Sequence, residues 1–310
     1  MFVAGTVNAD FVFGVQEPPE RGASLVARRL LRTSGGRAGN VAVMARRLGA
    51  RARLFGCVGA DELAQQALAG PRAAGADVTA VRRVPAGTGV VAILVAGGTK
   101  TMVLAPGAND AFSEADGERL AADLHAAGGG SVLVVDNEVS SASLTTALEA
   151  ARECGRATVL DPTRPERATE RLLHVADHVT PNADEAARMT GVDVASPRDA
   201  ERAGRRLLER GARHAHVRLP HGGCVTVRPD GQALAVAPPS DLPVVDTTGA
   251  GDAFAGTLAT AIMARRPLVE AVRLAVAAAA FAVTGFGAQE SYPEARALEA
   301  LGRRVRTECR

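Results

Sequence analysis

The sequence predicts an α/β protein built on a doubly wound, largely parallel sheet. Short runs rich in Val, Leu and Ala alternate along the 310 residues with longer Ala-, Arg- and Leu-rich segments of helical period. Strands separated by helices pair in parallel, because each helix carries the chain back to the same end of the sheet. Glycine-rich turns follow two of the apolar runs, and ligands of such folds bind beyond the carboxyl ends of the strands.

Short apolar runs are expected to form the strands and longer periodic segments the helices. No linker or low-complexity tract divides the chain, so we expect residues 1–310 to form one domain with a sizeable core. The expected strands are residues 2–7, 52–59, 131–137, 157–162, 177–182, 214–219 and 223–228. The expected helices are residues 41–48, 64–74, 114–127, 143–153, 183–190, 197–210, 250–265 and 268–284.

Two stretches, residues 12–33 and 87–106, interrupt this alternation because neither contains a clear helical segment. The second is apolar on both sides of Gly97 and Gly98, which predicts a hairpin that turns at these glycines. From the residues alone, both stretches could be β meanders at the edge of the main sheet.

Composition excludes several classes of protein. The formal net charge is +2 and aromatic residues make up 3% of the chain, whereas nucleic-acid surfaces need a basic excess and aromatic stacking platforms. We therefore expect no nucleic-acid partner. No GxxxxGK[ST] segment exists, which excludes a P-loop. Lys100, in the predicted hairpin, is the single lysine among 36 basic residues, so Schiff-base lysine chemistry is not expected.

The cysteines and apolar runs indicate a cytoplasmic protein. The cysteines show no CxxC spacing and are expected to be reduced, mostly buried thiols. They are Cys57, Cys154, Cys224 and Cys309. No signal peptide is expected before the first strand, and no apolar run is long enough to span a membrane. His214 and His216 share one face of a predicted strand, but no third metal ligand is evident, so packing or solvent exposure is expected there.

The segment DTTGAGDAFAG, residues 246–256, is the strongest chemical signal in the chain. Its Gly, Ala and Thr residues lie between a short apolar run and a small-residue helix, so backbone N–H groups can approach an anion at a helix N-terminus. Asp252 lies inside this turn. A carboxylate is repelled by a bound anion, so its position favours a role in proton transfer. The alternative is an ordinary N-capped helix with Asp252 in its first turn.

A second glycine-rich segment, TSGGRAGNVAVMARRLGARARLFGCVGAD at residues 33–61, has the same strand-turn-helix character. With these two segments the chain resembles the ribokinase, or PfkB, family of carbohydrate kinases. The first family signature is matched by Gly35, Gly36, Ala38, Asn40, Ala42, Gly49 and Gly59. The second is matched by Asp246, Thr247, Gly249, Ala250, Gly251, Asp252 and Gly256, with Thr257 in place of the usual Ala or Gly. Further matches in family order are NAD at 8–10, Glu138, PNADE at 181–185 and GFGAQES at 285–291.

The resemblance implies a ribokinase-like, three-layer α/β/α fold in which residues 12–33 and 87–106 form a small β-sheet lid over a sugar. It implies phosphorylation of a primary hydroxyl of a small, unphosphorylated sugar such as ribose, with ATP, Mg²⁺ and K⁺. Asp252 is then the base, and Gly249, Ala250 and Gly251 form the anion hole for the transferring group. A homodimer formed through the lid is also expected.

The resemblance further assigns polar residues near both glycine segments to the acceptor sugar. Asn8 and Asp10 leave the first strand on the same side, because residues i and i+2 share a face. Arg37 replaces the lysine usual in ribokinase, and this is not a neutral exchange, because arginine is larger and bidentate. The full set is Asn8, Asp10, Gly36, Arg37, Gly39, Asn40, Glu138 and Asp252.

The nucleotide and metal residues are assigned in the same way. Asn182 and Glu185 resemble the family's NxxE motif, which organises Mg²⁺ around the phosphates; the alternative is a helix N-cap with Glu185 on the surface. Arg218, Gly223 and Gly251 are expected to contact the nucleotide, although Pro220 removes one backbone donor there. A monovalent-cation site is implied at Asp246, Thr248, Ala282, Gly285, Gly287 and Ser291.

The residues leave two other functions open. Phe11 and Phe13, next to the sugar-binding pair, would form a base-stacking wall in a nucleoside kinase, or they are core residues of a strand. A sugar sensor without catalysis is disfavoured because Asp252 and its turn are intact, and a sensor needs no base.

Overall fold

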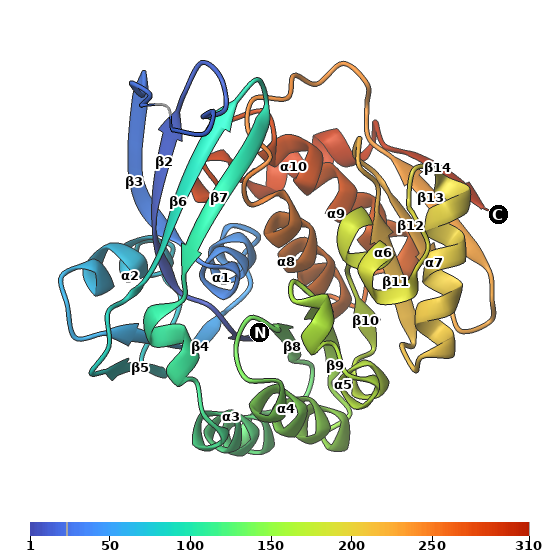
Figure 1. The fold of residues 1–310 in the computed structure, drawn as a ribbon. Coiled ribbons are helices and arrows are strands. Elements are labelled where there is room, and N and C mark those ends of the chain that lie inside the picture. The colour runs from blue at the N-terminus through green and yellow to red at the C-terminus, as the bar shows by residue number, and fades with distance from the viewer. Residues whose placement is uncertain (23, 310) are drawn as a thin grey trace.

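A computed structural model describes residues 1–22 and 24–309. Its strands form a large sheet and a small sheet that projects from the main body (Figure 1). The expected lid segment 12–33 includes residue 23, and that residue lies outside the described residues, as does the side chain of Cys309.

The large sheet is mostly parallel, as predicted. Its strands from β5 to β11 pair in parallel, and β12, β13 and β14 continue it in antiparallel pairs. The chain starts at β1, winds outward through β4 and β5, and returns through β8 to wind the other way. Such a reversal creates a crevice beyond the strand ends. In spatial order the strands are β14 (Arg306–Cys309), β13 (Ala233–Ala237), β12 (Cys224–Val227), β11 (His214–Arg218), β10 (His178–Val179), β9 (Ala157–Asp161), β8 (Val132–Asp136), β1 (Phe2–Ala4), β4 (Arg53–Gly59) and β5 (Val81–Val84).

Helices cover both faces of this sheet, which confirms the three-layer arrangement (Figure 1). Successive residues of β8 alternate between two cores: Leu133 and Val135 pack on one face, Val132 and Val134 on the other. The first face carries α3 (Glu114–Ala126), α4 (Ser141–Glu153), α5 (Glu170–Val175), α6 (Ala183–Thr190) and α7 (Pro197–Glu209). The second carries α1 (Arg37–Arg47), α2 (Leu63–Ala73), α8 (Ala250–Met263), α9 (Leu268–Ala282) and α10 (Ala295–Gly302).

The small sheet confirms the predicted hairpin and corrects the first strand. β6 and β7 are antiparallel and turn at Gly97 and Gly98. The expected strand 2–7 is wrong in its second half, because β1 ends at Ala4 and Asn8 begins β2 in the other sheet. Gly5, at φ +150°, allows this crossing, since any side chain there would collide with the buried carboxylate of Asp136. The order is β3 (Arg29–Gly35), β2 (Asn8–Gly14), β6 (Gly89–Ala96) and β7 (Thr99–Ala105).

The remaining elements are short. All eight expected helices form, while the helices α5 and α10 and the strands β5, β13 and β14 were not anticipated from the sequence. The 3₁₀ turns are η1 (Gly107–Ala111), η2 (Pro165–Arg167) and η3 (Gln289–Ser291).

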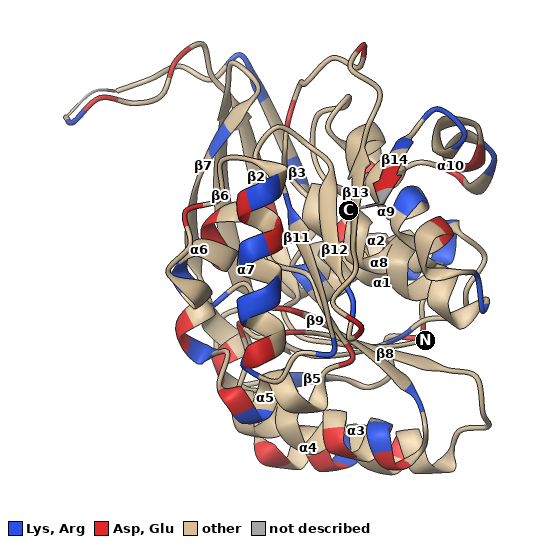
Figure 2. Cartoon of the chain, turned by 90° about the vertical axis from the view of Figure 1, so that its right-hand side faces the viewer, with Lys and Arg blue, Asp and Glu red and all other residues tan. Residues whose placement is uncertain are grey.

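Basic and acidic residues are interspersed on the outer helices α3, α5 and α7 (Figure 2). No helix within the described ranges is long and apolar enough to cross a membrane.

His214 and His216 have a third histidine beside them. The ring of His178, on β10, stacks on both, and its Nδ1 lies 3.0 Å from His216 Nε2. Burial lowers the pKa of His178 to about 3 and that of His216 well below its usual value. Within the part of the chain that the structure describes, no group of three or more His, Cys, Asp or Glu residues is placed to hold a metal ion, and these histidines are no exception. These rings therefore pack as neutral side chains.

Candidate active site

A cleft of about 1330 Å³ lies between the small sheet and the carboxyl ends of the parallel strands. Its volume exceeds the ~300–1,000 Å³ of most small-molecule pockets, so it has room for two ligands side by side. Polar residues of β2, α1 and the loop after β8 line one end, and apolar residues of α9 and of the segment after β13 line the other. The start of α8 lies between them.

The glycine turn at the start of α8 is held in place by packing from behind. Gly249 caps the helix at φ +76°, and a Cβ there would lie 2.5 Å from Ala288 Cβ. Tyr292 donates a hydrogen bond to the Gly249 carbonyl at 3.1 Å. The carbonyl is thus occupied, and the following N–H groups of Ala250 and Gly251 point out of the helix end, the direction from which an anion would approach.

Asp252 lies in the first turn of α8 and is buried. Asn40 of α1 donates to its Oδ2 at 2.6 Å, and Gln289 in turn donates to Asn40 Oδ1 at 2.9 Å. Burial raises the pKa of Asp252, an effect that Arg37, the Asn40 hydrogen bond and Lys100 oppose and that Asp161 reinforces. The carboxylate is therefore oriented by α1 and titrates above its ordinary range.

Arg37 joins three carboxylates at the polar end. Its guanidinium lies 3.1 Å from Asp161, 3.6 Å from Asp252 and 3.8 Å from Glu138. Asp161, at the end of β9, also lies 3.5 Å from Arg218. Two arginines thus share one buried carboxylate between them, a link that the sequence does not predict.

Asn8 and Asp10 lie on β2 and face the cleft, as their shared face predicted, although the strand belongs to the small sheet. Asn109 of η1 donates to Asn8 Oδ1 at 2.7 Å. Asp10 Oδ1 is buried without a hydrogen-bond partner among the described residues. Burial, reinforced by Asp252 and Glu290, raises the pKa of Asp10 to about 7. A buried acceptor without a partner is costly, so this site suits a hydroxyl-bearing ligand.

The glycines of the first signature divide into two kinds. Gly36 starts α1 at φ +81°, and a Cβ there would lie 2.5 Å from the Thr6 carbonyl oxygen, so only glycine fits. Gly39 is not crowded, because its nearest foreign atom would be Pro71 Cγ at 3.9 Å, and it does not line the cleft. The structure therefore brings Gly36, Arg37 and Asn40 to the site, but not Gly39.

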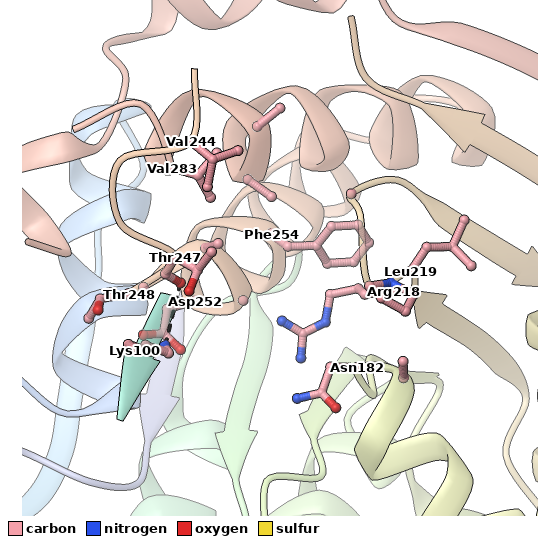
Figure 3. A pocket seen from close by; sticks show the side chains of 18 of the residues that line it. Lys100, Asn182, Arg218, Leu219, Val244, Thr247, Thr248, Asp252, Phe254 and Val283 are labelled. Carbon is pink, nitrogen blue, oxygen red and sulfur yellow. Dashed lines mark hydrogen bonds between the residues drawn. The ribbon is translucent and has the colours of Figure 1, made fainter. Parts of the chain in front are cut away.

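Asn182 and Glu185 form a reciprocal capping box at the start of α6. Asn182 Oδ1 accepts from the Glu185 N–H at 2.8 Å, and Glu185 Oε2 accepts from the Asn182 N–H at 2.7 Å. Glu185 is buried rather than on the surface, and Arg218 lies 3.4 Å from it. Arg218 also lies against Gly251, where any side chain would collide with its guanidinium. Figure 3 shows the Arg218 guanidinium and the Asn182 side chain at the same side of the pocket, pointing toward each other.

The apolar end of the cleft combines a tight turn with α9. The chain from Leu219 to Gly223 closes on itself, with the Leu219 N–H donating to the Gly223 carbonyl at 3.0 Å. Gly223, at φ +90°, approaches the Val236 carbonyl so closely that a Cβ would lie 2.6 Å away. Small and β-branched side chains complete this end: Val276, Ala279, Ala280 and Val283.

The residues expected to hold a monovalent cation converge behind the glycine turn. Asp246 accepts from the Thr248 N–H at 2.8 Å and from the Gly287 N–H at 3.0 Å. Gly285 lies against Ser291, whose buried Oγ has no hydrogen-bond partner among the described residues. Ala282 ends α9, next to the Val283 carbonyl that accepts from the Asp246 N–H.

Phe11 and Phe13 do not line the cleft. Phe11 alternates with Asp10 along β2, so its ring points to the opposite side, where it packs against the core and under Arg32. The strand-core interpretation of these residues is confirmed for Phe11.

A protein-family model described as the pfkB family of carbohydrate kinases matches residues 1–295. The chain belongs to this family. Curated relatives include a ribokinase of Haemophilus influenzae, 32% identical over 293 residues and covering 94% of each chain, and a deoxyribokinase of Salmonella typhi, 29% identical over 294 residues with the same coverage. A ribokinase of Arabidopsis thaliana, solved in complex with ribose and ATP, has the same fold, with a TM-score of 0.84 and 24% identity over 97% of this chain and 98% of that one.

This PfkB carbohydrate kinase therefore has its two family signatures on α1 and α8, joined by the Asn40–Asp252 hydrogen bond. Three residues of the site were not assigned from the sequence: Asp161, Asn109 and Lys100. Asn109 lies in the segment GAND, residues 107–110, just after the hairpin. Asp161 ends an apolar run, which is where a cleft residue of this fold is expected.

Proposed function

We propose that this kinase transfers the γ-phosphoryl group of ATP to a primary hydroxyl of ribose or a similar unphosphorylated sugar. The observation that carries the proposal is the position of Asp252. It is buried at the glycine turn that starts α8 and is hydrogen-bonded to Asn40, next to the polar end of the cleft. The names of the two curated relatives support a pentose acceptor, and the nucleotide in the Arabidopsis structure supports ATP as donor.

In this proposal Asn8, Asp10, Arg37 and Glu138 bind the sugar hydroxyls. Asp252 accepts the proton of the attacking hydroxyl as its oxygen forms the new bond to phosphorus, while the bond from phosphorus to the β-phosphate oxygen breaks. The N–H groups of the Gly249–Gly251 turn stabilise the charge on the transferring group. The enzyme then needs no covalent intermediate.

Mg²⁺ fits the Asn182–Glu185 pair through water. Both side chains already bond each other's backbone, and Mg²⁺ retains several of its own waters in such sites. The metal would neutralise phosphate charge. K⁺ fits behind the glycine turn, where the buried Ser291 hydroxyl has no hydrogen-bond partner among the described residues.

A homodimer through the small sheet is the proposed assembly. The side chains Leu30 of β3 and Val103 of β7 are exposed apolar groups. Both lie on the face of this sheet away from the cleft, the face that a second copy would cover.

The test is ATP consumption by the purified chain with a panel of pentoses, hexoses, their deoxy analogues and nucleosides. We expect sugars with a free primary hydroxyl to be phosphorylated. A site that hydrogen-bonds several hydroxyls rejects analogues lacking one, so loss of a contacted hydroxyl should lower kcat/KM by on the order of 10²-fold or more. Preference for adenosine over every free sugar would overturn the proposed acceptor, and the absence of any Asp252-dependent turnover would overturn the kinase mechanism.

A further inference from the structure

Lys100 is the only lysine of a chain that has 36 basic residues. It lies on β7, in register with Val95 of β6, and lines the cleft together with Met102 and Leu104 of the same strand face. Its side chain thus leaves the small sheet and points toward the large one.

The ammonium of Lys100 reaches the segment that leads into the anion turn. Its Nζ donates to the Thr247 carbonyl at 3.4 Å, two residues before Gly249. Figure 3 shows Lys100 at the same end of the pocket as Thr247 and Thr248. The charge of Lys100 also acts on Asp252 and Asp10, where it opposes the rise in pKa that burial causes. Lys100 therefore lies over the reacting end of the cleft.

Lys100 differs from the other cations of the cleft in its partners. Arg37 and Arg218 each pair with two or more carboxylates. Among the described residues, no carboxylate forms an ion pair with Lys100, and its one hydrogen bond is the long contact to Thr247. Burial, together with the charge of Arg37, lowers its pKa. A half-buried ammonium without a carboxylate is stabilised by an anion that enters the site.

We propose that Lys100 is a catalytic residue that contacts the transferring phosphoryl group from the small-sheet side of the cleft. This inference rests on the proposed function. The N–H groups of the glycine turn approach the group from α8, and the Lys100 ammonium approaches it from β7, so the charge that develops in the transition state is stabilised from both sides. The compact ammonium suits this place, because Arg37 already fills the adjacent space with a planar guanidinium.

The test compares Lys100→Met and Lys100→Arg with a matched control, Thr101→Met. Thr101 is the exposed neighbour on β7 that does not line the cleft, so it reports on hairpin folding alone. Each variant is assayed for kcat and both KM values with ATP and D-ribose, and again with ATP and sugars that carry a carboxylate or a phosphate. Calorimetry then measures binding of ADP with and without aluminium fluoride, a mimic of the transferring group.

Lys100→Met should lower kcat by on the order of 10²-fold, with both KM values changed by less than about threefold. ADP should bind this variant as tightly as wild type, but the gain in affinity from aluminium fluoride should be lost. Lys100→Arg should recover part of the kcat and part of the gain in affinity from aluminium fluoride, because it keeps the charge. Thr101→Met should match wild type.

Three results would overturn the role of Lys100 while the wild-type enzyme is active. The first is a Lys100→Met variant that keeps kcat and the aluminium fluoride effect. The second is an unchanged kcat with a raised KM confined to acceptors that carry a carboxylate or phosphate, which would make Lys100 an acceptor anchor. The third is an equal loss in Thr101→Met, which would make the effect structural. A wild-type enzyme that phosphorylates no acceptor in the panel refutes the proposed function itself.

Discussion

The Arg37 guanidinium lies 3.6 Å from the Asp252 carboxylate, and the same nitrogen lies 3.1 Å from Asp161. This places a permanent cation next to the proposed base. An adjacent cation favours the ionised carboxylate, whereas burial and the second carboxylate favour the protonated form. The protonation of Asp252 is therefore set by a balance that one substitution can shift.

Replacing Arg37 with Met should move the acidic limb of the kcat–pH profile to higher pH. The base must be ionised, so activity falls as pH drops through the pKa of Asp252, and removing Arg37 raises that pKa further. Lys100 and Asn40 still lower it and Asp161 still raises it. Arg37→Lys keeps the charge and should leave the limb near its wild-type position. A limb that does not move in Arg37→Met would refute the coupling between these two residues.

Asp252→Asn should abolish turnover while nucleotide binding remains. The amide keeps the shape of the carboxylate but cannot accept the proton, so kcat should fall by on the order of 10²-fold or more. Steady-state kinetics and ADP calorimetry measure the two effects separately. Glu118→Gln, an exposed change on α3, is the control for loss of a negative charge. More than a tenth of wild-type kcat in Asp252→Asn would rule out Asp252 as the base.

The sequence predicted the fold well because the fold depends on local periodicity. The five residues of β8 are enough to predict a buried strand, in which Val132 and Val134 lie on one face and Leu133 and Val135 on the other. The crossing of the chain between the two sheets at Gly5 could not be predicted in this way, since the Asp136 carboxylate that leaves room only for glycine there is distant in sequence. The strands β13 and β14 complete an edge of the sheet through antiparallel pairing, and their short segments carry little signal alone.

The parts of the site that lie in one continuous motif were predictable, whereas the ion pairs between residues far apart in the sequence were not. The glycine turn and Asp252 lie in one continuous segment, so the sequence alone shows that they are adjacent. Asp161 meets Arg37 only because β9 ends and α1 begins at the same crevice. Lys100 contacts Thr247, 147 positions further along the chain, and no local pattern in the predicted hairpin indicates that contact.

Asp10→Asn should make the free enzyme more stable at high pH while weakening sugar binding. The folded-state pKa of Asp10 is raised from 3.8 to about 7, so the folded protein binds more protons than the unfolded chain between these values. Its free energy of unfolding therefore falls as pH rises through this window. The amide cannot ionise and avoids this loss.

The measurement is Tm against pH for the wild type and for Asp10→Asn. The variant should lose less stability from acidic to neutral pH, and its Tm at about pH 8 should exceed that of the wild type. Some slope should remain, because burial also raises the pKa of Asp136 to about 7. The KM for sugar should rise, since a ligand hydroxyl loses a charged acceptor. Parallel curves of Tm against pH for the two proteins would contradict the prediction, because they would mean that Asp10 has the same pKa in the folded and the unfolded state.

Glu185→Gln should raise the Mg²⁺ concentration needed for half-maximal rate. Glutamine keeps the size of the side chain and can still accept from the Asn182 N–H, so α6 remains capped while the negative charge is lost. A rise of about tenfold would correspond to ~1.4 kcal/mol of metal binding. Glu166→Gln, which removes an exposed charge paired with Arg188, is the control. If Glu185→Gln keeps its Tm and its Mg²⁺ requirement is unchanged, Asn182 and Glu185 serve only to cap α6.

K⁺ should stimulate the enzyme more than Na⁺, and Ser291→Ala should reduce that preference. The Ser291 hydroxyl is buried without a hydrogen-bond partner among the described residues, and it lies against Gly285. Asp246 holds the same loop, because its carboxylate accepts a hydrogen bond from the Gly287 N–H. A bound cation would satisfy this oxygen and order the backbone that leads into the anion turn. The test titrates KCl against NaCl at constant ionic strength with saturating Mg²⁺, and Ser24→Ala, an exposed change, is the control. Equal rates in both salts across the titration would exclude the monovalent site and leave the proposed kinase mechanism intact.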